Sequence, residues 1–312
     1  MKRVVVTGGA GFIGSHAVDA YLAAGYEVSV FDDLSTGSLD NIAHVANKIE
    51  FIKADLRDLD ALHAAFAGGD VVLHLGALGS VPRSVADPGT THDVNATGTL
   101  NVLLAARDNG VGRVIFSSSS SVFGSNRELP KTEDMTGSPL SPYATTKRTG
   151  EDYCRQFGEF YGLDVVVVRF FNVFGPRQAA DHVYAAVIPK FIDAALRGDR
   201  AEIHGDGLQS RDFTYVGNAI DGLMLLSDME NKELAGQTFH LACGQSVSLL
   251  QILNELDALV GSPVGRNHVA TRPGDIKDSL ADISKLCERT GYRPQLNVAQ
   301  GLEKTLEWFR EG

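Results

Sequence analysis

Residues 3–16 read RVVVTGGAGFIGSH, a run of β-branched residues that leads into glycines and then into a helical pattern. The four glycines Gly8, Gly9, Gly11 and Gly14 spell both GxGxxG and GxxGxxG. Glycine permits a tight turn and lets the backbone approach a pyrophosphate, and the next helix offers unpaired N–H donors to that anion. The stretch therefore predicts a strand, a phosphate-binding turn and a helix, although an ordinary glycine-rich turn fits the same letters.

An acidic pair follows at the distance that a dinucleotide site needs. The next apolar strand ends in Asp32 and Asp33, about 20 residues after the glycines, where a carboxylate is expected to bind the ribose hydroxyls. Asp32 would repel a 2′-phosphate, and no arginine or lysine follows before Lys48. The pattern predicts NAD rather than NADP as the cofactor. For Asp33 two interpretations stay open, a contact with the ribose and a solvated residue in a turn.

Apolar strands alternate with amphipathic helices as far as residue 170. The segments are 4–7, 14–25, 27–32, 70–77, 95–109, 113–120 and 164–170. Nearly continuous apolar strands between helices are typical of a parallel sheet covered on both faces. We therefore predict an α/β protein with a Rossmann-type, doubly wound parallel sheet and a smaller C-terminal α/β substrate domain. The boundaries are 1–172 for the NAD-binding domain, to which segments near 212–242 can return, and 173–312 for the second domain, with helices at 249–260, 283–290 and 298–310.

The composition limits the classes of partner. The chain has 312 residues, 44% of them hydrophobic, with a formal net charge of -11, which argues against nucleic-acid and membrane surfaces. No run approaches the roughly 18 apolar residues of a membrane span, and the N-terminus has no signal-peptide pattern, so we expect a cytoplasmic protein. Cys154, Cys243 and Cys287 are widely spaced and the histidines lack metal-ligand spacing, so we expect reduced thiols and no metal.

A serine-ended strand precedes a tyrosine and a lysine at helical spacing. Residues 113–121 read RVIFSSSSS, and residues 143–147 read YATTK. Tyr143 and Lys147 share one helical face, so one ammonium can hold a cofactor ribose and also lower the pKa of the phenol. An unperturbed tyrosine, with a pKa of about 10, is a poor base at neutral pH, whereas a nearby cation and an oxidised nicotinamide favour the phenolate. The alternative is a helix that packs a tyrosine and solvates a lysine.

Taken together, these motifs resemble the extended short-chain dehydrogenase/reductase family. The matching segments, in the family's order from Thr7 to Lys285, are TGGAGFIGS, DDLSTG, ADL, HLGALGSVPRS, VNATGTLNVL, SSSSSVFG, SPYATTK, RFFNVFGPRQ, GDGLQSRDF and RPGDIKDSLADISK. The resemblance implies an NAD-binding Rossmann domain followed by a nucleotide-sugar domain. Within the family the sequence is most similar to UDP-hexose 4-epimerases, particularly those that act on N-acetylhexosamines, through residues 74–84 and 184–190.

Site residues follow from this resemblance position by position. It implies a catalytic set of Ser119, Tyr143 and Lys147. It implies cofactor contacts, besides Tyr143 and Lys147, at Gly8, Gly11, Phe12, Ile13, Gly14, Asp32, Asp33, Ser35, Thr36, Gly37, Asp55, Leu56, Leu75, Ala77, Asn95 and Phe170. It implies contacts with the UDP-sugar, besides Ser119, at Gly79, Ser80, Asn172, Val187, Arg211, Arg272, Asp275 and Ser279. Two arginines suit a diphosphate, although a surface ion pair is the alternative for either of them alone.

The implied reaction is NAD-dependent 4-epimerisation of a UDP-hexose through a transient 4-keto sugar, most directly UDP-GlcNAc and UDP-GalNAc, with UDP-glucose and UDP-galactose also open. One alternative is a nucleotide-sugar 4,6-dehydratase or decarboxylase. Such relatives have acidic residues after the catalytic serine or threonine, where Ser120 and Ser121 stand here. Another alternative is a non-catalytic NAD(H)-binding protein, which typically lacks the tyrosine and lysine pair. The family also implies a homodimer, formed here by residues 100–106 and 153–160.

Four positions bear on how far the resemblance extends. Phe123 stands where the family usually has tyrosine, which removes a hydroxyl outside the implied proton path. Gly217 and Asn218 replace an acidic pair, with an effect on the local loop that the sequence does not define. Ser279 lies where a bulky tyrosine would exclude an N-acetyl group on sugar carbon 2, so a serine predicts room for that group.

Overall fold

The computed structural model describes residues 1–180, 186–229, 234–271 and 277–311. The chain forms two compact units, which are described separately. Unit 1 contains residues 1–126, 133–170 and 220–239, and unit 2 contains residues 127–132, 171–219 and 240–312. The chain therefore leaves unit 1 for the short segment 127–132 and returns to it at residue 133. It leaves again at residue 171 and returns a second time for residues 220–239, which begin inside a helix.

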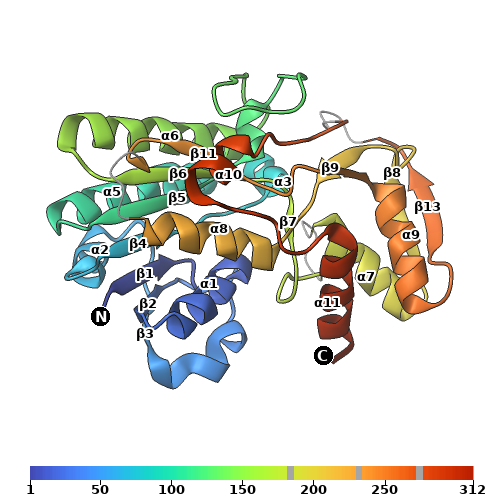
Figure 1. Cartoon of the computed structure of the whole chain (residues 1–312), viewed down its shortest axis with the longest axis horizontal. Helices are drawn as coiled ribbons and strands as arrows, with labels where there is room; N and C mark the ends of the chain where they lie inside the picture. Colours follow the sequence, from blue (N-terminus) through green and yellow to red (C-terminus); the bar gives the residue numbers. More distant parts are fainter. Residues whose placement is uncertain (181–185, 230–233, 272–276, 312) are drawn as a thin grey trace. The chain divides into compact units, whose positions relative to one another are not determined.

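A seven-stranded sheet forms the centre of unit 1 (Figure 1). The strands, in spatial order, are β11 (Thr238–Leu241), β6 (Val165–Phe170), β5 (Arg113–Ser119), β4 (Val71–His74), β1 (Arg3–Thr7), β2 (Glu27–Phe31) and β3 (Ile49–Ile52). Neighbours from β6 to β3 pair in parallel, with Val4 opposite both Val28 and Val71. This order reverses direction beside β1, as in dinucleotide-binding sheets, where ligands bind at the carboxyl ends of the strands.

Helices cover the two faces of this sheet. One face is covered by α2 (Leu59–Phe66), α5 (Gly98–Asp108) and α6 (Pro142–Tyr161), which lie side by side in Figure 1 and share one apolar core with β1, β4, β5 and β6. On α1 (Phe12–Ala23), Tyr21 forms a short hydrogen bond with Ser227 on α8 (Val216–Asp228). The shorter helices are η1 (Leu39–Lys48), α3 (Val81–Ala86), α4 (Pro88–His92), η2 (Asp93–Thr97) and η3 (Ser120–Phe123).

The helix α6 has clear start and stop signals. The Ser141 hydroxyl accepts a hydrogen bond from the backbone N–H of Ala144, and Pro142 occupies the first turn, where a missing N–H costs nothing. Gly162 ends the helix in the left-handed conformation at φ 69°, which glycine adopts without strain. These signals fix which side chains of the first turn, Tyr143 among them, face the end of β5.

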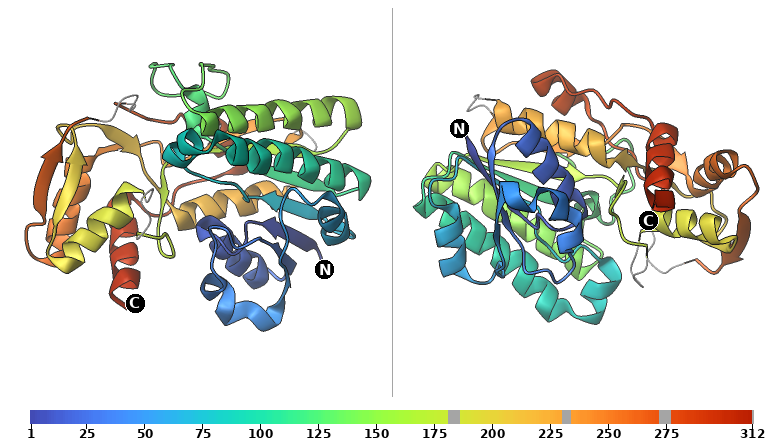
Figure 2. Two further views of the ribbon diagram at one scale, coloured as in Figure 1. Left: turned by 180° about the vertical axis from the view of Figure 1, so that it is seen from behind. Right: turned by 90° about the horizontal axis from the view of Figure 1, so that it is seen from below.

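Unit 2 consists of helices around three small sheets, seen from two further directions in Figure 2. Its strands are β7 (Val173–Phe174), β8 (Arg200–His204), β9 (Ser210–Asp212), β10 (Thr214–Tyr215), β12 (Ser246–Ser248) and β13 (Gly265–Val269). The pairs are β7 with β10, β8 with β13 and β9 with β12. Its helices are α7 (Val187–Arg197), α9 (Leu249–Val260), α10 (Ser284–Thr290) and α11 (Val298–Glu311), of which α7, α9 and α11 share an apolar core.

The predicted fold class is confirmed. The predicted helix at 249–260 has the observed bounds, and the helix predicted at 283–290 begins one residue later, because Ile283 is its N-cap. Asp282 still stabilises this helix start, since its carboxylate accepts the N–H of Ser284 at 2.8 Å. Within the described ranges, no helix combines the length and the apolar character that crossing a membrane requires.

Candidate active site

The glycine turn after β1 has no space for side chains. Gly8 lies at φ 71°, and a Cβ there would lie 2.7 Å from the backbone of Gly76. A Cβ on Gly14 would lie 2.1 Å from the Gly8 carbonyl oxygen. Gly11 is the N-cap of α1, so the N–H groups of Phe12, Ile13 and Gly14 have no partner within the helix. This turn is shaped to receive an anion, as the sequence predicts.

The acid after β2 also holds the glycine turn. Asp32 is 7% exposed, and its carboxylate accepts the N–H of Ala10 at 3.0 Å and of Leu34 at 2.8 Å. Burial raises the pKa of Asp32, and these two backbone bonds oppose the rise. Asp33 accepts the N–H of Ser35 at 2.9 Å within the following turn. Asp32 thus fixes the position at which β2 meets the turn, whereas the contacts of Asp33 leave both predictions for it open.

The other predicted cofactor residues lie on nearby loops of unit 1. Thr36 and Gly37 continue the turn after β2, and a Cβ on Gly37 would lie 2.9 Å from the backbone of Ala10. Asp55 pairs with Arg57 at 2.6 Å, and the side-chain hydrogen bond from Arg57 lowers the pKa of Asp55. Buried Leu56 lies within contact distance of the positions that Cβ atoms would occupy on Gly76 and Gly98.

Asn95 joins the segment after β4 to α6. Its side chain accepts the N–H of Leu78 at 2.8 Å and donates to the Leu78 carbonyl and to the Thr146 hydroxyl, each at 3.2 Å. The Thr146 hydroxyl in turn donates to the Tyr143 carbonyl at 2.8 Å. Leu75 and Ala77 are half-buried on the same segment. The predicted cofactor residue Asn95 is therefore connected to the helix that carries the predicted base.

Ser119, Tyr143 and Lys147 come together at the carboxyl end of β5. Ser119 is the last residue of β5, opposite Phe170 on β6, and its hydroxyl lies near enough to the Tyr143 phenol to lower the pKa of that phenol. The Ser119 hydroxyl also accepts the N–H of Ser121 at 3.1 Å. Lys147 is 5% exposed and donates to the Ser117 carbonyl at 2.7 Å. A helix and a strand end that are 24 residues apart in sequence thus present one set of polar groups.

The ionisation of these groups is governed by burial. Burial raises the pKa of the Tyr143 phenol, and the hydrogen bond with Ser119 opposes that rise. Burial lowers the pKa of Lys147 to about 8, so most of this lysine is still charged at pH 7. The sequence predicts that Lys147 acidifies the phenol. In this structure, however, the favourable contact of the phenol is with Ser119, and the effect of the lysine stays a prediction.

Two further predicted substrate residues of unit 1, Gly79 and Ser80, come directly before α3. Gly79 is exposed, and a Cβ there would meet no other atom within 4 Å. Ser80 is the N-cap of α3 and accepts the N–H of Arg83 at 3.2 Å. The cap explains the position of Ser80, and its predicted contact with a sugar stays a prediction.

In unit 2, three of the predicted UDP-sugar residues lie on β9 or bond to it. The Arg211 guanidinium donates to the carbonyls of Ser210 and Lys277, each at 2.9 Å. Asn172 has φ 35° and donates to the Asp212 carbonyl at 3.3 Å, while the Ser279 N–H donates to the Ser210 carbonyl at 3.0 Å. Val187 begins α7. Arg272 and Asp275, which were also predicted to bind UDP, lie outside the described residues.

Sequence reasoning missed Asp212 as the residue that holds this region together. Its fully buried carboxylate accepts the N–H groups of Cys243 and Gly244, each at 3.0 Å, and of Ala281 at 3.2 Å. Burial raises its pKa to about 6, against these backbone hydrogen bonds. The only signal in the sequence is its place beside Arg211, because the backbone groups that surround it come from distant segments.

The two departures from the family pattern have structural counterparts. The Arg169 guanidinium lies 4.9 Å from the centre of the Phe123 ring, so Phe123 packs against a cation without needing a hydroxyl. Asn218 accepts the N–H groups of Gln295 and Leu296 and donates to the Leu296 carbonyl at 2.7 Å. An acid could make the first two bonds but could not donate the third.

The chain is similar to known proteins and solved structures over nearly its whole length. Residues 4–242 match the model of the NAD dependent epimerase/dehydratase family. A UDP-glucose 4-epimerase of Mycolicibacterium smegmatis is 39% identical over 99% of this chain and 98% of its own length. The structure is similar to UDP-N-acetylglucosamine 4-epimerase from Methanobrevibacter ruminantium in complex with UDP-N-acetylmuramic acid (TM-score 0.94, 41% identity, 99% and 98% of the two chains). It is also similar to dTDP-glucose 4,6-dehydratase from Streptomyces venezuelae with NAD bound (TM-score 0.91, 34% identity, 99% and 97%).

Proposed function

From the premise that this chain belongs to the NAD-dependent epimerase/dehydratase family, we propose that it is a UDP-hexose 4-epimerase that interconverts UDP-GlcNAc and UDP-GalNAc. Its cofactor is NAD, as in the family and in the similar structures that contain NAD. UDP-glucose and UDP-galactose form a second pair of candidate substrates. The observation that carries the proposal is that Ser119 acts on the Tyr143 phenol at the end of β5, with Lys147 bonded to the same strand end and no carboxylate at positions 120 and 121.

The residues present fit NAD. The glycine turn has no room for a Cβ at Gly8 or Gly14, which leaves its backbone free to approach a pyrophosphate. The carboxylate of Asp32 is held at the end of β2, where it would meet a ribose and repel a 2′-phosphate. When bound, NAD supplies reversible acceptance of a hydride at its nicotinamide, which makes a transient 4-keto sugar the expected intermediate.

The remaining steps are proton transfer and positioning by the chain. Tyr143 would accept the proton of the sugar 4-hydroxyl and later return it, while the Ser119 hydroxyl orients the same oxygen. The ammonium of Lys147 would favour the phenolate and bind the cofactor ribose. Arg211 and Asn172 would hold the diphosphate, so the intermediate stays bound while its ring can turn. An inverted configuration at carbon 4 then results without net consumption of cofactor.

A specific feature favours epimerisation over elimination or decarboxylation. Those reactions need further acid and base groups beyond the oxidising set, and the relatives that perform them have acidic residues directly after the catalytic serine or threonine. Here Ser120 and Ser121 form the start of η3, and the Ser121 hydroxyl is buried without a hydrogen-bond partner among the described residues. A serine hydroxyl has an ordinary pKa far too high for a general base at neutral pH.

The test is incubation with UDP-GlcNAc, UDP-GalNAc, UDP-glucose and UDP-galactose, followed by separation of the products. We expect the two N-acetylated sugars to interconvert and expect no water to be lost from either. Tyr143→Phe should abolish turnover and leave NAD binding and the melting temperature nearly unchanged, because only the proton acceptor is removed. A dehydrated or decarboxylated product, or wild-type turnover by Tyr143→Phe, would refute the proposal.

We also propose a homodimer through α5 and α6. Phe160 and Tyr161, at the end of α6, are 71% and 55% exposed, which leaves two adjacent aromatic side chains that a partner can cover. Sedimentation equilibrium should give twice the monomer mass. Phe160→Asp should shift the protein toward the monomer, and a monomeric wild-type protein at micromolar concentration would contradict the assignment.

A further inference from the structure

The helix that carries Lys147 buries a second charged residue one turn further along. Lys147 and Glu151 are 5% and 8% exposed. Residues four apart on a helix share one face, with Cβ atoms about 5–6 Å apart. A buried carboxylate is costly unless it is paired and hydrogen-bonded, so its partners define what it can do.

Glu151 is held by a complete set of donors. Arg169 on β6 donates from Nε and from a terminal nitrogen to the two carboxylate oxygens, each at 2.8 Å, and the Ser118 hydroxyl makes a further short bond. Arg169 also donates to the Glu133 carbonyl at 3.0 Å and lies over the Phe123 ring. A two-point bond with a guanidinium keeps a carboxylate ionised and fixes its orientation. Glu151 is therefore held in a buried ion pair with Arg169.

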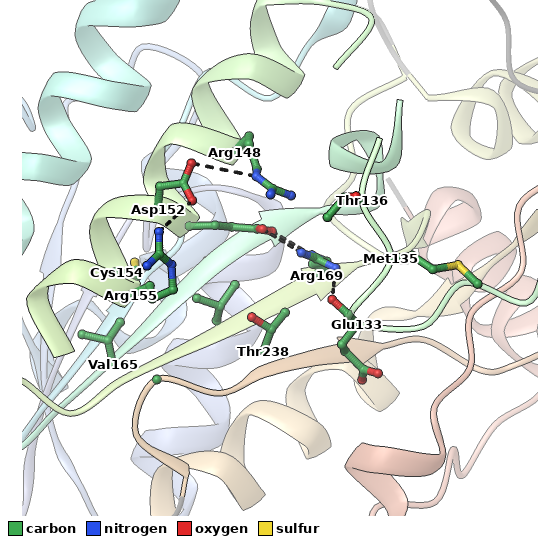
Figure 3. A pocket seen from close by; sticks show the side chains of 13 residues that line it. Glu133, Met135, Thr136, Arg148, Asp152, Cys154, Arg155, Val165, Arg169 and Thr238 are labelled. Carbon is green, nitrogen blue, oxygen red and sulfur yellow. Dashed lines mark hydrogen bonds and ion pairs between the residues drawn. The ribbon is translucent and has the colours of Figure 1, made fainter. Parts of the chain in front are cut away.

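A pocket lies beside this pair (Figure 3). Figure 3 shows Arg169 within it, joined to Glu133, while Arg148, Asp152 and Arg155 extend from α6. Asp152 has a 49% exposed side chain, and its ion pairs with described residues are long, at 3.9 Å with Arg148 and 3.6 Å with Arg155. α6 thus carries two adjacent acids, of which one is buried and the other is solvated.

Few polar groups replace the water that the Lys147 ammonium loses on burial. Its ammonium donates to the Ser117 carbonyl and lies 5.1 Å from the Phe116 ring, and both are weak substitutes for lost water. Burial lowers its pKa to about 8, against the influence of Cys154 and Glu151. Burial raises the pKa of the Cys154 thiol, which is therefore uncharged at neutral pH.

Apart from Glu151, whose charge is shared with Arg169, the titratable groups described around Lys147 are neutral. His74 on β4 is fully buried, which together with the lysine charge lowers its pKa to about 3. Its ring nitrogens bond to Thr7 at 2.8 Å and to Thr99 at 3.0 Å. Tyr143 on α6 is protonated at neutral pH, since burial raises its pKa. Among the described groups that act on Lys147, Glu151 is the anion.

We propose that Glu151 is a positioning residue whose carboxylate keeps the buried ammonium of Lys147 charged and held at the end of β5. The consequence for catalysis rests on the proposed function, in which Lys147 serves Tyr143 and the cofactor. The charge of Lys147 itself is a property of the folded chain, and it can be measured whatever reaction the protein performs.

Loss of the Glu151 charge should lower the pKa of Lys147. A lysine is charged below its pKa, and removal of a nearby anion lowers that pKa. If the pKa of about 8 falls by about one unit, the charged fraction of Lys147 at pH 7 falls from about nine-tenths to about half. The alkaline limb of any Lys147-dependent activity should move to lower pH by the same amount.

The test is a direct titration of Lys147 by NMR in protein labelled with ¹³C at lysine Cε, with the signal assigned from its absence in Lys147→Met. We expect a pKa near 8 in the unmutated protein. Glu151→Gln should lower it by about one unit or more. Asp152→Asn removes the same charge from the neighbouring, solvated position, and it should shift the pKa by no more than a few tenths.

Glu151→Gln leaves the Arg169 cation buried without its carboxylate, so a second variant guards against loss of the fold. Glu151→Gln/Arg169→Gln removes both charges, and its Lys147 pKa should lie between those of the unmutated protein and of Glu151→Gln. An unchanged Lys147 pKa in either folded variant would overturn the proposal. So would a lysine already uncharged at pH 7 in the unmutated protein. These outcomes do not depend on epimerase activity, so they are separate from a failure of the proposed function.

Discussion

At the scale of single residues, Asp32 serves two purposes that a substitution can separate. Its carboxylate holds the glycine turn through Ala10 and carries the charge that is predicted to reject NADP. Asp32→Asn removes the charge and keeps one oxygen as an acceptor for the backbone. We expect the ratio of NAD to NADP affinity to fall about tenfold, because close charge repulsion is worth on the order of 1–4 kcal/mol.

Calorimetry with both cofactors measures this ratio. Asp33→Asn removes the adjacent charge and reports on the open role of Asp33, and a change as large as that of Asp32→Asn would assign it a ribose contact. Equal affinities for NAD and NADP in the unmutated protein would contradict the prediction for Asp32.

The small side chain at Ser279 leads to a prediction about which sugar substituents the enzyme accepts. Its backbone is held against Ser210, next to Arg211, and its small side chain is predicted to leave room for an acetamido group. Ser279→Tyr should suppress turnover of UDP-GlcNAc at least tenfold by steric exclusion while sparing UDP-glucose, if the parent uses it. Ser279→Ala is the matched control and should retain both activities. Parental turnover of UDP-GlcNAc by the tyrosine variant would exclude this pocket assignment.

Sequence spacing could predict Tyr143 and Lys147, because a helix places residues four apart on one face whatever its surroundings. It could not predict that Glu151 pairs with Arg169, or that Asp212 is enclosed by backbone N–H groups. Those properties depend on which distant segments pack against the helix and the strand. Whether a charged side chain is buried depends on tertiary packing. From a helical pattern alone, an acidic residue is predicted to be exposed to solvent, as Asp152 is.

At the scale of elements, the turn between β1 and α1 depends on the absence of side chains. Gly14→Ala would place a Cβ 2.1 Å from the Gly8 carbonyl oxygen, and that backbone atom cannot move without opening the turn. We expect loss of NAD binding and destabilisation by about 1–3 kcal/mol or more. Gly158→Ala in α6 is the control, since its Cβ would meet no atom closer than 3.6 Å.

Thermal unfolding and NAD titration of both variants measure these effects. Gly158→Ala should stabilise the protein by about 0.4–1 kcal/mol, because alanine loses less backbone freedom in a helix than glycine. Normal NAD affinity in Gly14→Ala would show that the turn tolerates a side chain and does not hold the pyrophosphate closely.

The start of α8 is joined to the segment before α11 by one amide. Asn218→Asp restores an acid of the usual pair but loses the bond to the Leu296 carbonyl and buries a charge. We expect a loss of about 1–3 kcal/mol in the free energy of unfolding, measured in urea. Asn297→Asp is the control, because Asn297 caps the N–H of Gln300 from an exposed position where an acid caps equally well. Equal effects of the two substitutions would contradict the specific role of Asn218.

Element positions were predictable where apolar periodicity is strong and caps are present. The strands β1, β2, β4, β5 and β6 are buried and β-branched, and α9 has a serine cap and a terminal glycine. The strand β3 was missed because only four residues, IEFI, form it at the sheet edge, where burial is partial. Short edge strands carry little pattern, so pairing with a neighbour decides whether they form.

At the scale of the whole molecule, neither compact unit is formed by one continuous stretch of the chain. The sequence indicates a change of texture after residue 172 and a possible return near 212–242. In the structure, residues 220–239 belong to unit 1 and residues 127–132 belong to unit 2. Residues 127–132 join unit 2 through Lys131, whose backbone forms hydrogen bonds with the backbones of Leu280 and Asp282. No local sequence pattern predicts a pairing between such distant segments.

The assignment of NAD to unit 1 and of the UDP group to unit 2 is a prediction that hydrogen exchange can test. A ligand at 100 times its dissociation constant stabilises the folded state by about 2.7 kcal/mol, and amides at its site gain the most local protection. NAD should therefore slow exchange in the turn at residues 8–14, where α1 leaves N–H groups without helical partners. UDP should slow exchange around β9 and at Ser279.

Arg211→Gln should abolish the protection by UDP and leave the protection by NAD unchanged, because only the guanidinium contact with a diphosphate is lost. Protection by UDP that is confined to unit 1, or that survives Arg211→Gln at full strength, would show that the nucleotide sugar is held elsewhere.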